Sequence, residues 1–386
     1  MALPEKATHQ QTRAFNHRLV LRTIYDRHAV SRAEIARLTG LTRTSVSDLV
    51  GELLRNGLVV EVGPGQSSGG KQPILLEVAV EGRHLIGLDL AESAFTGAVV
   101  DLRGRIIRSL RLPLDGRDGQ RAVDRVIELI EALRADSRHH LLGVGVGAPG
   151  LIDSDSGTVR WAVNLDWAEL PLGPLLEERF GVPVVVANDS QAAALAELTF
   201  FRRPRPQNLV VVKIGRGIGA GIILGGQLFQ GDGYGAGEIG HVAAARGGAQ
   251  CHCGSQGCLE TVASMRAMVE RASELRPGID EDGFIAAYRA GNEQVRAIAH
   301  EGAWYVGHTL AGLIGVLNVN HVLIVGPVAA LGMEWLGDVR RMMRDGALQL
   351  LTRDTEVEYG HVSDDIVVLG ASAMLMNHQL GLSLIR

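Results

Sequence analysis

The chain of 386 residues is too long for one compact domain, so we expect two or three. Its composition, 46% hydrophobic and 21% charged, is that of a globular protein. The densest apolar stretch, residues 303–325, is interrupted by two histidines and two asparagines, and residues 1–13 lack the apolar core of a signal peptide. We therefore expect a cytoplasmic protein without a membrane span.

Positive charge is concentrated at the N-terminal end. Residues 1–80 contain ten Lys or Arg and seven Asp or Glu, a net charge of +3, so the remaining residues carry −8 to give the total of −5. A basic segment on an acidic body fits a nucleic-acid contact at one end of the molecule.

The first 80 residues begin with three predicted helices. Apolar residues recur at helical spacing over residues 20–25, and Ser31 to Glu34 form a capping box that opens a second helix. Gly40 supplies a turn, and a third helix begins at about Thr42. Residues 58–62 and 75–78 are predicted strands, joined by a loop rich in Gly and Ser.

This order is typical of a winged helix-turn-helix, in which the second helix of the motif enters the DNA major groove. The candidate DNA contacts are polar residues at the start of that helix and one lysine at the wing tip: Arg43, Thr44, Ser45, Ser47 and Lys71. Arg43 is the strongest candidate, because a guanidinium matches guanine and phosphate oxygens. The alternative is a small helical domain that contacts other proteins.

From residue 81 onward strands and helices alternate, which predicts an α/β fold. The predicted strands are residues 84–90, 96–101, 142–147, 182–187, 209–214 and 220–228. The predicted helices are centred on residues 123–133 or span residues 259–274, 293–317 and 335–350.

All three cysteines lie between residues 251 and 258, and an odd number in so short a segment favours a metal site over a disulfide framework. Three thiolates and one imidazole supply a closed tetrahedral zinc site, and thiolates favour zinc over magnesium or calcium. By spacing alone, His241 and His252 are both candidates for the nitrogen ligand. The alternative is three reduced thiols in a loop. With four protein ligands we expect a structural ion without a metal-bound water.

Several motifs resemble the ROK family, which contains bacterial repressors and sugar kinases. The specific family pattern E-x-G-H followed by C-x-C-G-x-x-G-C-x-E runs from Glu238 to Glu260. A Val-Ala-Asn-Asp match ends at Asp189, and a less specific Asn-Leu-Asp-Trp match begins at Asn164. The head, with its Gly-Gly-Lys-Gln-Pro wing, resembles the repressor branch. The resemblance covers essentially the whole chain and implies a winged helix-turn-helix followed by a two-lobed, actin-like ATPase (ribonuclease H-like) sugar-kinase fold.

The resemblance also implies which residues bind ligands. By this resemblance, the residues that would bind sugar hydroxyls are Asn164, Asn188, Asp189, Glu238, His241 and Glu260. Carboxylates and amides suit this role because they exchange hydrogen bonds with vicinal hydroxyls. His241 would also complete the zinc site with Cys251, Cys253 and Cys258, which decides against His252. One imidazole nitrogen then faces the metal and the other faces the sugar.

The loops that hold ATP in the family's kinases are altered here. The first normally reads D-x-G-G-T, but residues 89–93 read Asp-Leu-Ala-Glu-Ser, and Glu92 would lie beside a phosphate. At about 4 Å, such repulsion is on the order of 4 kcal/mol. The second loop has Arg216 in place of threonine, and Pro327 removes an N–H donor from the third. We predict a domain without catalytic residues or kinase activity, although Asp189, the family's catalytic base, is retained.

We therefore predict a sugar-responsive transcriptional repressor, released from operator DNA when a sugar or sugar phosphate closes the lobes. A homodimer or tetramer is expected, because an operator with two half-sites is bound by two helix-turn-helix domains. The alternatives are an active sugar kinase with a DNA-binding head and a zinc-sensing regulator. The predicted domains are residues 1–80 for the head, 81–190 for the first lobe, with a terminal helix at 370–386 returning to it, and 191–369 for the second lobe with the zinc site.

Overall fold

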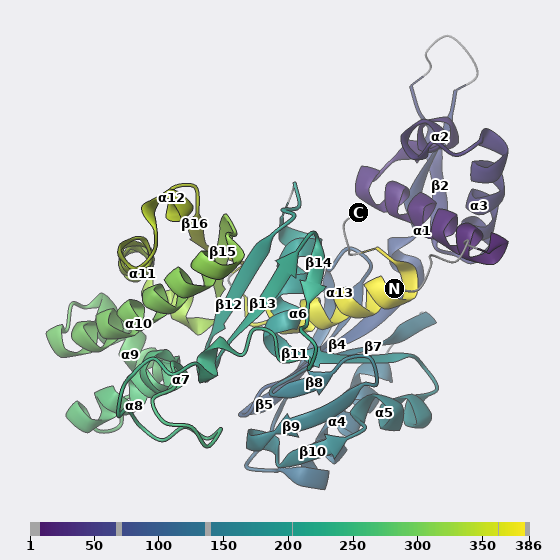
Figure 1. The fold of residues 1–386 in the computed structure, drawn as a ribbon. Helices are drawn as coiled ribbons and strands as arrows, with labels where there is room; N and C mark the ends of the chain where they lie inside the picture. The colour runs from purple at the N-terminus through teal and green to yellow at the C-terminus, as the bar shows by residue number, and fades with distance from the viewer. Residues whose placement is uncertain (1–7, 67–71, 136–139, 203, 362, 383–386) are drawn as a thin grey trace.

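The computed structural model describes residues 8–66, 72–135, 140–202, 204–361 and 363–382. An N-terminal head of helices with a small sheet precedes two larger five-stranded sheets (Figure 1). Among the helices in the described ranges, none combines the length and the apolar character that crossing a bilayer requires.

The head contains three helices and a three-stranded sheet of order β1-β3-β2. Thr42 caps the third helix by accepting a hydrogen bond from the Ser45 N–H at 3.2 Å, and Ser31 caps the second helix by accepting from the Glu34 N–H at 3.2 Å. Gly40 ends the second helix at φ 71°, in the left-handed region that glycine adopts without strain. The elements are α1 (His9–Arg27), β1 (Val30–Ser31), α2 (Arg32–Thr39), α3 (Arg43–Arg55), β2 (Val59–Pro64) and β3 (Ile74–Val78).

The two large sheets share one topology. In each, three consecutive antiparallel strands form one side, and two later strands add in parallel on the other side. The first sheet has the order β11-β7-β4-β5-β6 and consists of β4 (Arg83–Leu90), β5 (Ala94–Asp101), β6 (Ile106–Pro113), β7 (His140–Ala148) and β11 (Val184–Asn188). The second has the order β14-β13-β12-β15-β16 and consists of β12 (Leu209–Ile214), β13 (Ile218–Leu224), β14 (Gln227–Phe229), β15 (His321–Val325) and β16 (Glu356–Tyr359).

Each sheet has a hydrophobic core on its outer side. The core of the first sheet includes α4 (Gly119–Arg134), α5 (Leu172–Phe180) and residues of the small sheet formed by β8 (Leu151–Asp153), β9 (Thr158–Ala162) and β10 (Trp167–Leu170). The core of the second sheet includes α7 (Glu260–Ala263), α8 (Met265–Leu275), α9 (Glu281–Arg289), α10 (Glu293–Leu317) and α11 (Met333–Gly346). The short α12 (Gln349–Thr352) follows α11.

Two helices lie between the sheets. They are α6 (Asp189–Ala196) and the C-terminal α13 (Ile366–Leu380), and one buried cluster joins them to β5, β12, β13 and β15. The two helices cross closely at Gly370, where an added Cβ would lie 1.8 Å from the Ala192 carbonyl oxygen. The fit therefore depends on glycine at this position. Figure 1 shows α13 beside β4, β7 and α6.

Several predicted elements differ from the structure. The terminal helix predicted at 370–386 is α13, which begins at Ile366 and ends at Leu380. The predicted strand at 220–228 is a hairpin, because Gly225 and Gly226 adopt positive φ and turn the chain between β13 and β14. The predicted helix at 259–274 is broken at Ser264, whose side chain caps α8 by accepting from the Ala267 N–H. The predicted helix at 335–350 begins two residues earlier and ends at Gly346. The long helix α10 spans the predicted residues.

The head packs on the C-terminal half of α13. One buried cluster combines residues of α1 and α13 with residues of the first sheet and its loops: Val20, Leu21, Ile24, Tyr25, Leu85, Leu102, Leu375, Met376 and Leu380. Polar contacts add to it. Arg103 Nη1 donates to the Tyr25 carbonyl oxygen at 2.7 Å, and Arg205 lies 3.3 Å from Asp26. The head and the body thus share a continuous core.

Candidate functional site

The start of α3 presents polar side chains to solvent. Arg43, Thr44 and Ser47 are exposed, whereas Ser45 is half-buried, with its hydroxyl oxygen 2.9 Å from that of Thr42. Lys71 lies outside the described residues. An exposed helix start that carries a guanidinium and hydroxyls can contact DNA phosphates and base edges.

A second group of polar residues gathers where α6 meets the two sheets; we call it the polar cluster, and it consists of Asp89, Asn188, Asp189, Lys213, Glu238 and Glu260. Asn188 ends β11 and caps α6 by accepting from the N–H groups of Ser190 at 2.9 Å and Gln191 at 3.2 Å. Its Nδ2 donates to the Gly150 carbonyl at 3.0 Å and to Glu238 Oε1 at 3.3 Å. Capping therefore fixes the direction of a buried amide.

Asp189 pairs with a lysine from the second sheet. Lys213 Nζ lies 2.8 Å from Asp189 Oδ2, and the Ser190 hydroxyl donates to Asp189 Oδ1 at 3.1 Å. Burial lowers the pKa of Lys213, but the carboxylates of Asp189 and Asp89 outweigh burial and raise that pKa above its usual value. Lys213 is therefore a cation in the middle of the cluster.

The carboxyl of Asp89, at the end of β4, faces this lysine. Burial raises the pKa of Asp89 to about 7, the Lys213 ammonium opposes the rise, and the charge of Asp189 adds to it. Among the described residues, the buried Oδ1 of Asp89 has no hydrogen-bond partner. Near neutral pH this carboxyl is therefore partly protonated.

Glu238 and Glu260 bring two more carboxyls from the second lobe. Glu260 Oε2 accepts from the Ile218 N–H at 3.1 Å, and Glu260 Oε1 accepts from Arg266 at 3.3 Å. Burial, with the charges of Asp189 and Glu260, raises the pKa of Glu238 to about 7. Glu238 can therefore donate as well as accept a hydrogen bond near neutral pH, which suits hydroxyl ligands.

Asn164 lies apart from these residues. It belongs to the short helix η2 (Val163–Leu165), which follows β9, and its side chain is exposed. Among the described residues it makes no hydrogen bond to the polar cluster. Of the six predicted sugar ligands, the structure brings Asn188, Asp189, Glu238, His241 and Glu260 near one another and leaves Asn164 apart.

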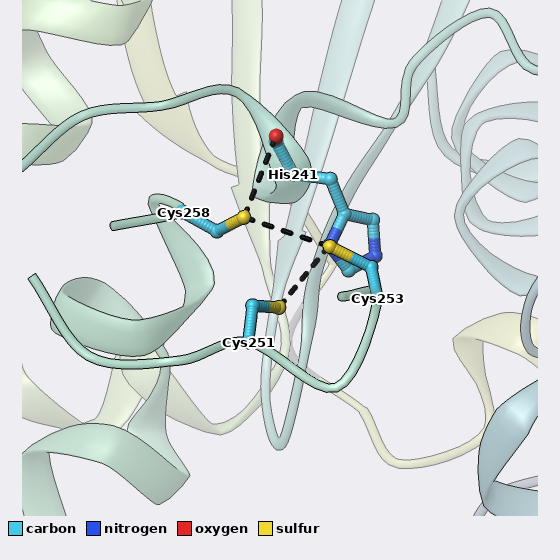
Figure 2. A group of neighbouring side chains, drawn as sticks. All are labelled: His241, Cys251, Cys253 and Cys258. Atoms are coloured by element: carbon cyan, nitrogen blue, oxygen red, sulfur yellow. Dashed lines mark hydrogen bonds between the residues drawn. The ribbon is translucent and has the colours of Figure 1, made fainter. Parts of the chain in front are cut away.

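The four predicted metal ligands converge, as Figure 2 shows. The ligand atoms of His241, Cys251, Cys253 and Cys258 all lie within 4.8 Å of one another. His252, the other nitrogen candidate, is exposed and outside this group. The loop closes at Gly257, where φ is 75° and an added Cβ would lie 1.9 Å from the Ala245 carbonyl oxygen.

The spacing of these atoms fits a tetrahedral thiolate site. A tetrahedron with metal–sulfur bonds of about 2.3 Å has edges of about 3.8 Å. The Cys253 and Cys258 sulfurs are 3.7 Å apart, and Cys251 Sγ lies 3.6 Å from His241 Nδ1. Burial and the neighbouring thiols raise the pKa of Cys258 to about 12, so a bound cation is needed to hold all three sulfurs as thiolates.

The His241 ring connects the metal ligands to the polar cluster. Nδ1 faces the sulfurs, and Nε2 lies 3.9 Å from Glu238 Oε2. A metal on Nδ1 would therefore fix the direction of Nε2.

Comparison with known proteins identifies the family. The profile of the MarR family matches residues 12–66, and the profile of the ROK family matches residues 85–378. The chain belongs to the ROK family. It is 33% identical to a putative xylose repressor of Caldicellulosiruptor sp. (strain Rt8B.4), an alignment that covers 96% of this chain and 98% of the relative.

Solved ROK structures show the same fold. A ROK family transcriptional regulator described as a homologue of the E. coli MLC protein superimposes with a TM-score of 0.85 at 25% identity, covering 96% of this chain and 98% of that one. A ROK glucokinase from Streptomyces griseus, in complex with glucose and AMPPNP, superimposes with a TM-score of 0.69 at 28% identity, covering 75% of this chain and 98% of that one. The predicted fold class is confirmed: a helix-turn-helix head precedes the two-lobed, actin-like ROK fold. The full-length similarity places the chain with the family's transcriptional regulators.

Within this ROK fold, the structure adds contacts that the motifs did not predict. Arg216 Nε lies 2.9 Å from Glu92 Oε2, so the altered first and second loops are joined by an ion pair between the lobes. Pro327, in the altered third loop, packs near Gly215 of the second. The motifs also did not predict Lys213 as a site residue. The sequence feature that could have indicated it is a single lysine within the apolar strand Leu-Val-Val-Val-Lys-Ile.

Proposed function

We propose that this protein is a transcriptional repressor that binds operator DNA as a homodimer or tetramer and leaves it when a sugar or sugar phosphate occupies the polar cluster. Relatives named "putative xylose repressor" and "N-acetylglucosamine repressor" support a sugar effector. The observation that carries the proposal is the continuous packing from the polar cluster through α6 and α13 to α1 of the head.

The proposed DNA contacts are Arg43, Thr44, Ser45, Ser47 and Lys71. The exposure of Arg43, Thr44 and Ser47 supports their role as DNA contacts. The hydrogen bond between the Ser45 and Thr42 hydroxyls orients Ser45 along the start of the helix. Hydroxyls there would bond phosphates, and Arg43 would reach a base or a phosphate.

The proposed sugar ligands are Asn188, Asp189, Glu238, His241 and Glu260, with Asn164 as an outlying sixth. The first five would come from both lobes: Asn188 and Asp189, where β11 meets α6, would belong to one, and the segment from Glu238 to Glu260 would belong to the other. A sugar that bonds both groups would draw the lobes together. Because α13 packs on the first sheet and on α1, such a movement would change the spacing of two heads in an oligomer.

This mechanism follows the proposed division of the chain. The head would comprise residues 1–80, the first lobe residues 81–190 together with the terminal helix 370–386, and the second lobe residues 191–369. The packing of α13 (Ile366–Leu380) on β4 and β7 supports the return of the terminal helix to the first lobe.

The metal in this proposal is a structural zinc ion held by His241, Cys251, Cys253 and Cys258. Four protein ligands would fill its coordination shell, so zinc would supply rigidity and no activated water. Its part in the switch would be to hold the His241 ring toward the polar cluster.

We further propose that the domain has no kinase activity. Glu92 and Arg216 join two loops that hold phosphates in the family's kinases, and Asp189 is engaged by the Lys213 ammonium. The N–H groups of Gly215 and Ile218 in the second loop donate to Gly217 O at 2.9 Å and Glu260 Oε2 at 3.1 Å, so neither is free for a phosphate.

An electrophoretic mobility shift on the DNA upstream of the protein's own gene tests the proposal. We expect a complex that a sugar dissociates without ATP. Failure to bind that DNA, or a complex indifferent to every sugar, would contradict the proposal. A parallel assay of ATP hydrolysis with each sugar should stay far below about 1 per second, an ordinary enzyme rate, and turnover at that rate would favour the kinase alternative.

A further inference from the structure

The cations that belong to the polar cluster or border it are already paired with carboxylates. Lys213 Nζ lies 2.8 Å from Asp189, Arg216 Nε lies 2.9 Å from Glu92, and Arg266 Nη2 lies 3.3 Å from Glu260. The Lys213, Asp189, Arg266 and Glu260 side chains are each less than one quarter exposed. The Lys213–Asp189 and Arg266–Glu260 pairs are therefore fixed parts of the site, whereas the Arg216–Glu92 pair is more exposed.

Carboxyls also outnumber these cations. Asp89 and Glu238 make no ion pair with any of the three cations among the described residues, although Asp89 faces Lys213. A dianionic ligand placed among these carboxyls would meet a net negative charge.

The Glu92–Arg216 ion pair joins the turns that follow the two strands carrying Asp89 and Lys213. Glu92 follows Asp89 by three residues in the turn after β4, and Arg216 follows Lys213 by three residues in the turn after β12. A group that extends from a sugar past Asp89 and Lys213 would therefore meet this pair. Glu92 occupies the Nε donor of Arg216 and offsets its charge, so a phosphate on the remaining guanidinium donors would also meet the Glu92 carboxylate.

One further cation stands nearby. Arg111 lies on β6, in the same row of the sheet as Thr96 and Asp89, two strands away from Asp89. It is exposed and makes no ion pair among the described residues. Arg111 is thus a nearby cation that could attract an anion, and its charge also acts on Asp89.

We propose that the effector is an uncharged sugar and that the Glu92–Arg216 ion pair excludes its phosphorylated form. This inference rests on the proposed function, since it concerns the ligand of the same site. Sugar hydroxyls donate hydrogen bonds to carboxylates, so an acidic site matches a neutral polyol. A phosphate group requires unpaired cations or free N–H groups, and here the three cations and two of the loop N–H groups are committed.

Matched pairs of ligands test this inference. Binding to the full chain is measured by titration calorimetry at pH 8, where phosphate esters are dianions, and operator release is measured by mobility shift. The pairs are glucose, mannose and N-acetylglucosamine, each with its 6-phosphate, and xylose is added alone. The sugar that binds should do so at least about tenfold more tightly than its phosphate, equivalent to about 1.4 kcal/mol.

Two substitutions locate the cause. Glu92→Gln frees Arg216 and should raise the affinity for the 6-phosphate about fivefold or more while the affinity for the neutral sugar stays constant. Glu61→Gln is the matched control, because Glu61 forms a similar exposed pair with Arg32 at 2.9 Å in the head; it should change neither affinity. Arg111→Ala should also leave both affinities unchanged.

The outcomes separate the two proposals. Tighter binding of any 6-phosphate than of its parent sugar by the wild type would overturn this inference and leave the proposed function standing. An unchanged ratio in Glu92→Gln, or a loss of phosphate binding in Arg111→Ala, would overturn the role given to the ion pair. If no sugar in either form bound or released the operator, the proposed function would itself fail, and this inference with it.

Discussion

Replacing Asp89 by asparagine should stabilise the protein, and the gain should grow as the pH rises from 5 to 8. Burial raises the pKa of Asp89 from 3.8 to about 7, and its Oδ1 has no hydrogen-bond partner among the described residues. The folded state therefore favours the protonated carboxyl. The stability associated with that proton is fully present below pH 3.8 and is lost as the pH rises through about 7.

The magnitude follows from proton linkage. With pKa values of 3.8 unfolded and about 7 folded, the carboxyl reduces the free energy of unfolding by about 1.7 kcal/mol at pH 5 and about 4.3 kcal/mol at pH 8. The wild type therefore loses about 2.6 kcal/mol over this interval through one group. Asparagine keeps the size of the side chain and does not ionise, so the variant escapes the loss.

Urea denaturation of both proteins at pH 5 and pH 8, followed by tryptophan fluorescence, measures the effect. Titration of the cysteines and of Glu238 occurs in both proteins and cancels in the difference between them. Asp124→Asn, at an exposed carboxylate on α4, is the control and should show no such pH dependence. An Asp89→Asn gain that is equal at both pH values would refute the assignment of a buried, partly protonated carboxyl.

Three further predictions concern the proposed sites. Glu260→Ala should retain operator binding and lose the sugar response, because Glu260 is held in the polar cluster by the Ile218 N–H and Arg266. Glu274→Ala, at an exposed site, is the control. Normal release of DNA by the Glu260 variant would remove Glu260 from the proposed sugar site. Arg43→Ala should weaken operator binding by about 1–3 kcal/mol in a mobility shift and leave sugar affinity unchanged, whereas unaltered operator affinity would exclude Arg43 as a contact. Cys258→Ser should lower the bound zinc measured by mass spectrometry to a small fraction of one ion per chain, and full retention would contradict the ligand set.

Much of the local structure could be predicted from the sequence because its signals are local. Thr42 and Ser31 cap helices through N–H groups only three residues away, and α10 follows a long amphipathic pattern. The three cysteines and the E-x-G-H motif lie within 21 residues, from Glu238 to Cys258, so the spacing alone limits which atoms can meet. Ser264 was the exception, since its cap breaks a helix that continuous apolar periodicity had predicted.

The tertiary structure decided which distant groups face one another. The two five-stranded sheets repeat one topology without a repeat visible in the sequence, because many different residues can fill the same buried strand positions. Glu92 and Arg216 are 124 residues apart, and the charge of Glu92 suggested only a repelled phosphate until the fold placed the two side chains 2.9 Å from each other. The same holds for Lys213 beside Asp189 and for α13 beneath α1. A charged or apolar residue in the sequence indicates what kind of group it can contact. Only the folded chain determines which group that is.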